Sequence, residues 1–292
     1  MDVKNFIDLH MHIGPEILPR KFTVRKIIEL EKDKIRGMAL KNHLYPTAPL
    51  IKSEESGELL LIGSVTLNNY VGGLNPDVVY ASAKISKTPI IVWFPTINAD
   101  NFLNGSRYEI PPEWVGDGFK SRLSKDVRGI RILDKEENLT KEGYAVLLSI
   151  KENNCILATG HISWQEAKKL VEGAVQLGIE KIIVTHPIYQ LIGMPLDVQK
   201  ELASKKGVYI EQNYAMYLID KIPIEEIAMQ IREVGPEKCI ISSDMGQISS
   251  PSSSEAMGRF SDLLLEQGLT ENEVRIMGEV NPRKLIGLEE KR

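Results

Sequence analysis

Short apolar runs recur along the chain, and amphipathic stretches separate them. The runs are continuous rather than alternating with polar residues, which is typical of parallel strands that are covered on both faces. They predict eight strands, at Phe6–His10, Gly37–Lys41, Leu59–Thr66, Ile90–Phe94, Cys155–Thr159, Lys181–Thr185, Val208–Glu211 and Cys239–Ser243.

The stretches between the runs carry helix start and stop signals. Ser163 and Glu166 have the spacing of a capping box, which begins a helix that runs to about Leu177. Pro76 follows Asn75 at the first position of another helix. The other predicted helices are Val24–Arg36, Lys141–Asn153, Pro195–Lys206, Pro223–Val234, Ser254–Gln267, Glu271–Glu279 and Pro282–Ile286, and the Asn75-capped helix runs over Pro76–Ile85.

Eight strand-then-helix units predict an α/β fold, a single (β/α)8 TIM barrel that spans residues 1–292. One interval is too long, so we expect an insertion at about 95–154, after the fourth strand. It holds a ninth apolar run, Gly129–Leu133, which could instead be a barrel strand in place of Leu59–Thr66. An open doubly wound sheet is the other architecture, but no GxGxxG motif follows the first strand.

Composition narrows the class of protein. Among 292 residues, 36 Lys and Arg stand against 40 Asp and Glu, for a net charge of −4, which argues against nucleic acid as a partner. No apolar run approaches the length of a membrane span, and no signal peptide is recognisable at the N-terminus. Cys155 and Cys239 are expected to be buried free thiols. We therefore expect a cytoplasmic protein that acts on a small-molecule substrate. The protein could form a homo-oligomer.

All five histidines fall at or just beyond the carboxyl end of a predicted strand. They are His10, His12, His43, His161 and His186. In a barrel these positions share one face, where active sites are built. His10 and His12 are two residues apart on a strand, so both imidazoles can reach one ion, although an isolated HxH can also be a packed pair. Asp8 has the same parity and could hold a histidine by a hydrogen bond.

Acidic residues end two later strands. Asp244 follows the last strand, which neighbours the first strand in a closed barrel. A carboxylate there can complete a metal site or take a proton from water, and it could also simply form a turn. Glu211 ends the seventh strand and faces either the pocket or solvent.

This pattern resembles the amidohydrolase superfamily of metal-dependent hydrolases. The matching pieces are Asp8–His12, Thr159–His161, Thr185–Pro187, Ser243–Asp244 and the closing segment Asn281–Leu288. The resemblance implies that His10 and His12 are metal ligands and that His161 and Asp244 complete or bridge the site. It also implies that Asp244 is the general base, and that His186 is a ligand of a second metal or orients the attacking water.

The sequence departs from the superfamily at the end of the fourth strand. Binuclear members usually carry a carboxylated lysine or a glutamate there, whereas this chain reads Trp93-Phe94-Pro95-Thr96. Either the enzyme holds one ion, or Lys41 on the second strand supplies the bridge between two. Lys41 could also act as an acid or an anion clamp, or be a paired structural lysine. Zn²⁺ is the first expectation for an imidazole and carboxylate site, with Mn²⁺, Fe²⁺ and Ni²⁺ open.

Four further residues are candidates for substrate contact: His43, Asn75, Arg107 and Tyr108. Gly72-Gly73 before Asn75 could bind an anion at a helix start or form a plain capped turn. Arg107 and Tyr108 lie in Asn98–Lys125, which could be a lid or an oligomer contact.

The predicted reaction is attack of metal-activated water on an amide, ester, amidine-like or phosphoester centre. The alternatives are a metal-dependent decarboxylase on the same scaffold and a barrel that only binds.

Overall fold

The strands of the protein form one curved parallel array. The computed structural model describes residues 1–17, 19–105 and 129–288. The strands are β1 (Ile7–His12), β2 (Gly37–Lys41), β3 (Leu60–Ile62), β4 (Ser64–Thr66), β5 (Ile91–Trp93), β6 (Ile156–Ala158), β7 (Ile182–Val184), β8 (Val208–Asn213) and β9 (Cys239–Ser242). Only Gly63 separates β3 from β4, so the two pieces occupy one position, and all eight predicted strands are present.

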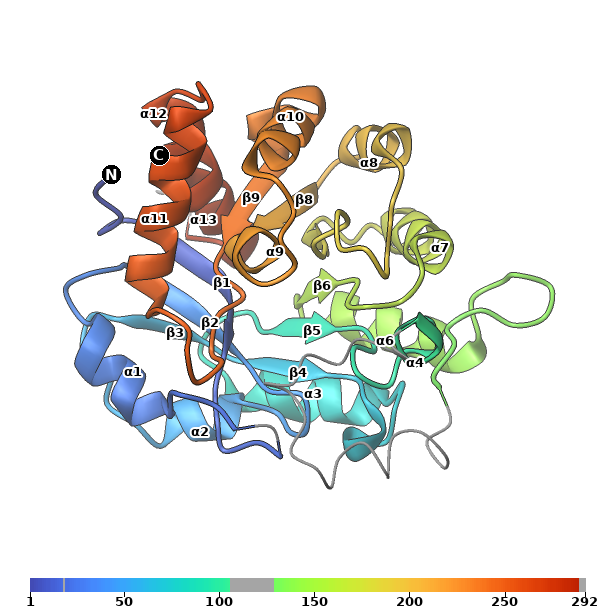
Figure 1. The fold of residues 1–292 in the computed structure, drawn as a ribbon. Coiled ribbons are helices and arrows are strands. Elements are labelled where there is room, and N and C mark those ends of the chain that lie inside the picture. The colour runs from blue at the N-terminus through green and yellow to red at the C-terminus, as the bar shows by residue number, and fades with distance from the viewer. Residues whose placement is uncertain (18, 106–128, 289–292) are drawn as a thin grey trace.

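Each strand pairs in parallel with the next one along the chain, in the orders β1-β2-β3 and β4-β5-β6-β7-β8-β9. Two backbone hydrogen bonds join the residues just after the last strand to the first strand. The N–H of His12 donates to the carbonyl of Met245 (2.8 Å), and the N–H of Asp244 donates to the carbonyl of His10 (2.8 Å). The array is therefore closed, with helices around its outside (Figure 1), as the (β/α)8 prediction requires.

The helices confirm most of the predicted boundaries to within a few residues, including the capping box at Ser163. They are α1 (Val24–Glu31), α2 (Ala48–Lys52), α3 (Pro76–Ile85), α4 (Asp100–Gly105), α6 (Lys141–Glu152), α7 (Trp164–Gln176), α8 (Leu196–Ala203), α9 (Tyr214–Leu218), α10 (Ile224–Val234), α11 (Ser253–Glu266), α12 (Glu271–Arg275) and α13 (Asn281–Ile286). The π-helix Ile276–Val280 joins the last two. Of the described helices, none has both the length and the apolar character needed to cross a bilayer.

The first predicted helix is too long. It was expected to reach Arg36, but α1 ends at Glu31, and Asp33 adopts a left-handed conformation (φ 71°). This turn lets Ile35 bury its side chain (3% exposed) before the chain enters β2. A tertiary requirement for burial overrides the helical pattern of the local sequence.

The interpretation of Gly129–Leu133 as a barrel strand is wrong. β5 pairs directly with β6, with Ile91 opposite Ile156. Within the described part of the segment, Ile130 forms only an isolated bridge with Ala99. The run Leu59–Thr66 therefore keeps its place in the barrel.

A bulge in β1 decides which side chains enter the barrel. Its register against β2 shifts from Asp8 opposite Met38 to Met11 opposite Leu40, so β1 contains one extra residue. Leu9 belongs to the apolar cluster inside the barrel, and Met11 to the cluster between the barrel and the helices. Since the bulge reverses the alternation, His10 and His12 face the interior like Leu9.

The same bulge overturns the expectation for Asp8, which does not hold a histidine ring. Its Oδ1 accepts hydrogen bonds from the backbone N–H groups of His10 (3.1 Å) and Ser243 (3.0 Å). Its Oδ2 accepts from the hydroxyls of Ser243 (2.5 Å) and Ser253 (2.6 Å). Burial raises the pKa of Asp8 to about 6. This carboxyl group joins β1 to β9 and to the start of α11.

Replacing Asp8 should therefore destabilise the barrel. We expect Asp8→Ala to lower the free energy of unfolding by about 3 kcal/mol or more, because it leaves several buried donors without an acceptor. Denaturant unfolding followed by fluorescence measures the change. The exposed Asp2→Ala should have little effect, and equal stability of the two variants would contradict the role of Asp8.

Candidate active site

His10 lies at the centre of a buried polar cluster at the carboxyl ends of the strands. Its ring is fully buried, with Nδ1 3.1 Å from Glu211 Oε1. An ionised carboxylate can only accept, so Nδ1 donates and Nε2 keeps its lone pair. Nε2 lies 3.0 Å from Lys41 Nζ and 3.1 Å from Asp244 Oδ1.

His12 and Asp244 complete the same cluster. His12 Nε2 lies 3.0 Å from Asp244 Oδ1, and Asn213 Nδ2 donates to Asp244 Oδ2 (3.3 Å). Asp244 adopts a left-handed backbone conformation (φ 53°), which is uncommon for a residue with a side chain. The chain therefore turns sharply after β9, and the carboxylate stays inside beside both imidazoles.

Glu211 belongs to the site. The sequence left open whether its side chain faces the pocket or solvent. Its side chain is fully buried, and it accepts from the hydroxyl of Ser242 (2.7 Å) and the N–H of His186 (3.2 Å) as well as bonding to His10. It sits on β8 with the inward-facing parity of Asn213, so strand alternation could have placed it. Its contact with His10 comes from a strand that is not adjacent to β1, which sequence reasoning could not supply.

Lys41, at the end of β2, and His43, two residues beyond it, both face the site, as their spacing predicts. Lys41 Nζ lies 4.1 Å from the centre of the Trp93 ring, close enough for a cation–π contact. The Trp93 ring also packs against His10, with 4.3 Å between ring centres. The His43 ring lies 4.7 Å from that of His12. Trp93, at the end of β5, thus contacts both Lys41 and His10.

Burial controls the protonation of this cluster. Desolvation lowers the pKa values of His10 and His12 well below the usual range. It lowers the pKa of Lys41 to about 8, raises that of Asp244 to about 8, and raises that of Glu211. The imidazoles are therefore neutral at pH 7, which is the form that binds metals.

The rings of His161 and His186 lie beside the cluster, and the backbone N–H of His186 reaches Glu211. The ring of His186 is 5.9 Å from that of His10, and the ring of His161 is 5.1 Å from that of His186. Burial lowers the pKa of His186 to about 3. Neither Nδ1 atom has a hydrogen-bond partner among the described residues.

Asn75, another predicted contact, has hydrogen-bond partners within its own turn and helix. Asn75 caps α3, because its Oδ1 accepts from the N–H of Asp77 (3.0 Å) while its Nδ2 donates to the carbonyl of Val71 (3.1 Å). This is the plain capped turn that was one of the two interpretations. Arg107 and Tyr108 lie outside the described residues.

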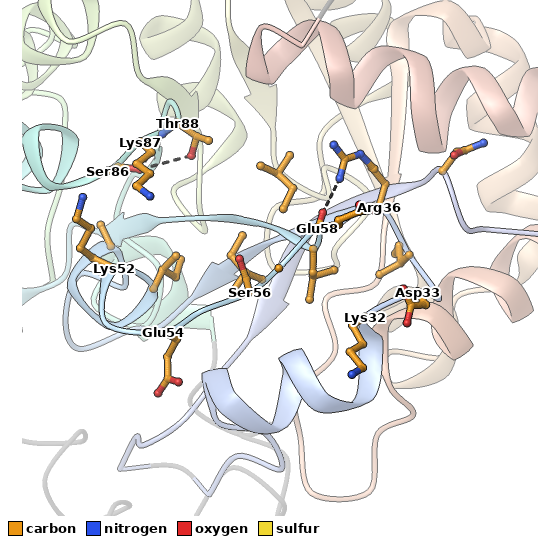
Figure 2. Close-up of a pocket in the computed structure, with 18 of the residues that line it drawn as sticks. Lys32, Asp33, Arg36, Lys52, Glu54, Ser56, Glu58, Ser86, Lys87 and Thr88 are labelled. Atoms are coloured by element: carbon orange, nitrogen blue, oxygen red, sulfur yellow. Dashed lines mark hydrogen bonds between the residues drawn. The ribbon is translucent and has the colours of Figure 1, made fainter.

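A groove of about 1030 Å³ lies at the opposite ends of the strands, beside residues that precede β1, β2, β3 and β5. Figure 2 shows charges of both signs around it, among them Lys32, Asp33, Lys52 and Glu54, and a hydrogen bond from Arg36 to the carbonyl of Glu58. These side chains do not converge on a buried point, so we place the candidate active site at the carboxyl ends.

The donors at that end fit a divalent metal ion. His10, His12 and Asp244 each offer one ligand atom, and these atoms lie within 4.8 Å of one another. They form the one such group among the residues the structure describes. Imidazole nitrogens and a carboxylate oxygen that lie this close together are a donor set that suits Zn²⁺ and similar ions.

Three of the solved structures with a similar fold carry the names of hydrolases. An amidohydrolase from Burkholderia multivorans is 10% identical, covers 97% of this chain and 99% of its own, and has a TM-score of 0.62. An amidohydrolase from Pseudomonas aeruginosa is 11% identical, covers 97% of each chain, and has a TM-score of 0.60. A Xaa-Pro dipeptidase is 13% identical, covers 99% of this chain and 76% of its own, and has a TM-score of 0.57.

These likenesses show the fold alone: the chain is an α/β barrel similar to those of these proteins. The described residues add a metal-site-like His-His-Asp group. The chain belongs to DUF6282, a family of unknown function whose model matches residues 5–211. No curated protein sequence matches the chain significantly.

The depressed pKa of Lys41 predicts a change of stability with pH. In the unfolded chain the amine stays protonated to about pH 10.5, whereas in the folded protein it loses its proton near pH 8. Between these values the unfolded chain binds more protons, so folding becomes more favourable as pH rises.

Urea unfolding at pH 8, 9 and 10 in the presence of a chelator tests this expectation. Wild type should gain unfolding free energy over this range relative to Lys41→Met, which lacks the amine. The exposed Lys32→Met controls for the loss of a positive charge. Parallel profiles for wild type and Lys41→Met would contradict the shift.

Proposed function

We propose that this protein is a metal-dependent hydrolase that acts on a small molecule. The observation that supports it is the buried convergence of His10, His12 and Asp244 at the end of the barrel where enzymes of this architecture carry their active sites. His10, His12 and Asp244 would hold the ion, with His161 as a further ligand near them. Zn²⁺ is the first choice, followed by Mn²⁺, Fe²⁺ and Ni²⁺.

A bound divalent ion supplies Lewis-acid activation of water at this site. Asp244 accepts the proton of the attacking water on its carboxylate and returns it to the leaving group. Glu211 holds the His10 ring with Nε2 directed into the site. His186 lies beside His10 with its Nδ1 unengaged by described residues, where it can bond to the oxygen that gains negative charge.

We further propose a single ion, with Lys41 as a cationic group of the pocket rather than a bridge. The packing of Lys41 Nζ over the Trp93 ring supports this, because a cation–π contact favours the charged form of the amine. We also infer that residues 95–154 are an insertion after the fourth barrel strand. The bonds open to attack are those of amides, esters, amidine-like groups and phosphoesters.

Metal content tests the proposal directly. Protein without an affinity tag, purified without chelators, should contain about one equivalent of a transition metal by elemental mass spectrometry. The double variant His10→Asn, His12→Asn should lose it and remain folded by circular dichroism, while Lys41→Ala keeps the same count. If wild type contains no metal and takes up neither Zn²⁺ nor Mn²⁺, the hydrolase proposal is wrong and a binding protein is favoured.

Glu211 should control the affinity for that metal. Glu211→Gln keeps the size of the side chain but removes the charge that fixes the tautomer of His10, and we expect metal affinity to fall roughly 10–100-fold. Competition with a fluorescent chelator measures it. Glu31→Gln is the matched control, because Glu31 is also buried (1% exposed) but accepts a bond from Ser254 at the start of α11. Equal losses in both variants would argue for a general effect of a buried charge.

A further inference from the structure

His43, just beyond β2, is held by hydrogen bonds to three residues from other parts of the chain. Its backbone N–H donates to Glu16 Oε1 (2.8 Å), and its carbonyl accepts from Asn68 Nδ2 (3.0 Å). Its ring nitrogen Nδ1 lies 2.8 Å from the hydroxyl oxygen of Thr96. The side chain is buried (1% exposed), so these three contacts fix both the position and the plane of the imidazole.

The orientation of the Asn68 amide is determined by its partners. Its Oδ1 faces the backbone N–H groups of Thr96 (2.9 Å) and Asn98 (3.3 Å), which can only donate. The other end is therefore Nδ2, and its two hydrogens go to the carbonyl of His43 and to Thr96 Oγ1 (2.9 Å). Thr96 Oγ1 is thus an acceptor toward Asn68.

The proton of the Thr96 hydroxyl then has one destination. Among the described residues, His43 Nδ1 is the acceptor within hydrogen-bond reach of Thr96 Oγ1. Nδ1 must therefore carry a lone pair, and the proton of the neutral ring is on Nε2. A ring nitrogen that carries a proton does not bind a metal, so His43 differs from His10 and His12 in chemistry although it lies beside them.

His43 Nε2 has no hydrogen-bond partner among the described residues. A buried N–H without an acceptor is unfavourable, and native proteins rarely keep one without a reason. The ring that bears it packs against His12, one of the three residues of the metal-site-like group. An acceptor supplied by a ligand in the site would satisfy it.

We infer that the His43 Nε2–H group is a substrate-binding donor that takes a carbonyl or carboxylate oxygen of a molecule bound beside the His10–His12–Asp244 group. The inference rests on the proposed function for the presence of a substrate there. Thr96 and Asn68 are positioning residues, because they act by fixing which nitrogen of His43 carries the proton. Oxygen acceptors match this donor because it is neutral and its direction is set before binding.

Nuclear magnetic resonance of the tautomer tests the first step without any substrate or metal. Two-bond proton–nitrogen correlations in histidine-labelled protein distinguish Nε2–H from Nδ1–H, and a His43→Phe sample identifies the signals. We expect Nε2–H in wild type and in Thr96→Ser, and an increased share of Nδ1–H in Thr96→Val, which lacks the hydroxyl. A wild-type ring with its proton on Nδ1 would overturn the inference.

Binding of acetate to zinc-loaded protein tests the second step. By titration calorimetry, His43→Phe should bind acetate at least tenfold more weakly than wild type, whereas His43→Gln, which can place an amide N–H near the same point, should recover part of the affinity. Both variants should keep the zinc content of wild type. Unchanged acetate affinity in His43→Phe would overturn the inference.

The two proposals fail in different ways. If wild type binds no zinc, the hydrolase proposal fails, while the tautomer and an acetate-dependent shift of the His43 Nε2 signal in metal-free protein still decide the role of His43. If zinc binds but the tautomer is Nδ1–H, the metal site stands and the donor does not.

Discussion

The single extra residue in β1 is the constraint on which the site depends. Because side chains alternate along a strand, one inserted residue moves everything after it to the opposite face. Leu9 fills the barrel interior, and His10 and His12 follow it inward instead of alternating outward. Asp8 is left on the outer side, where it bonds to Ser243 and Ser253. The bulge thus brings His10 and His12 into the metal-site-like group. It also leaves Asp8 where its hydrogen bonds hold β1 beside the end of β9.

The site combines this geometry with buried charge. Lys41, Glu211 and Asp244 lie together away from water, and their pKa values shift because desolvation disfavours the charged forms. A fold keeps such a cluster only when the surrounding packing holds it, and the left-handed turn at Asp244 adds backbone strain of the kind that collects at functional sites. Trp93 covers one side of the cluster, because its ring packs on both His10 and Lys41. These features favour a reactive role over a structural one.

Sequence reasoning succeeded where the signal is local. The eight apolar runs became strands, and the capping signals at Asn75 and Ser163 begin α3 and α7. It failed where distant contacts compete with local pattern. The helical periodicity continues past Glu31, yet burial of Ile35 ends the helix there. The local pattern also left Gly129–Leu133 open as a barrel strand, and only the direct pairing of β5 with β6 excludes that alternative.

The sequence by itself determined that five histidines and Asp244 gather at one end of a barrel, because every parallel strand delivers its carboxyl end to the same face. Only the tertiary structure decided which of them touch. The bulge in β1 aims His10 and His12, and Glu211 reaches His10 from a strand that is not its neighbour. The Asn68–Thr96–His43 chain joins three separate loops. Such contacts depend on register, twist and side-chain direction, which are properties of the assembled sheet rather than of any segment.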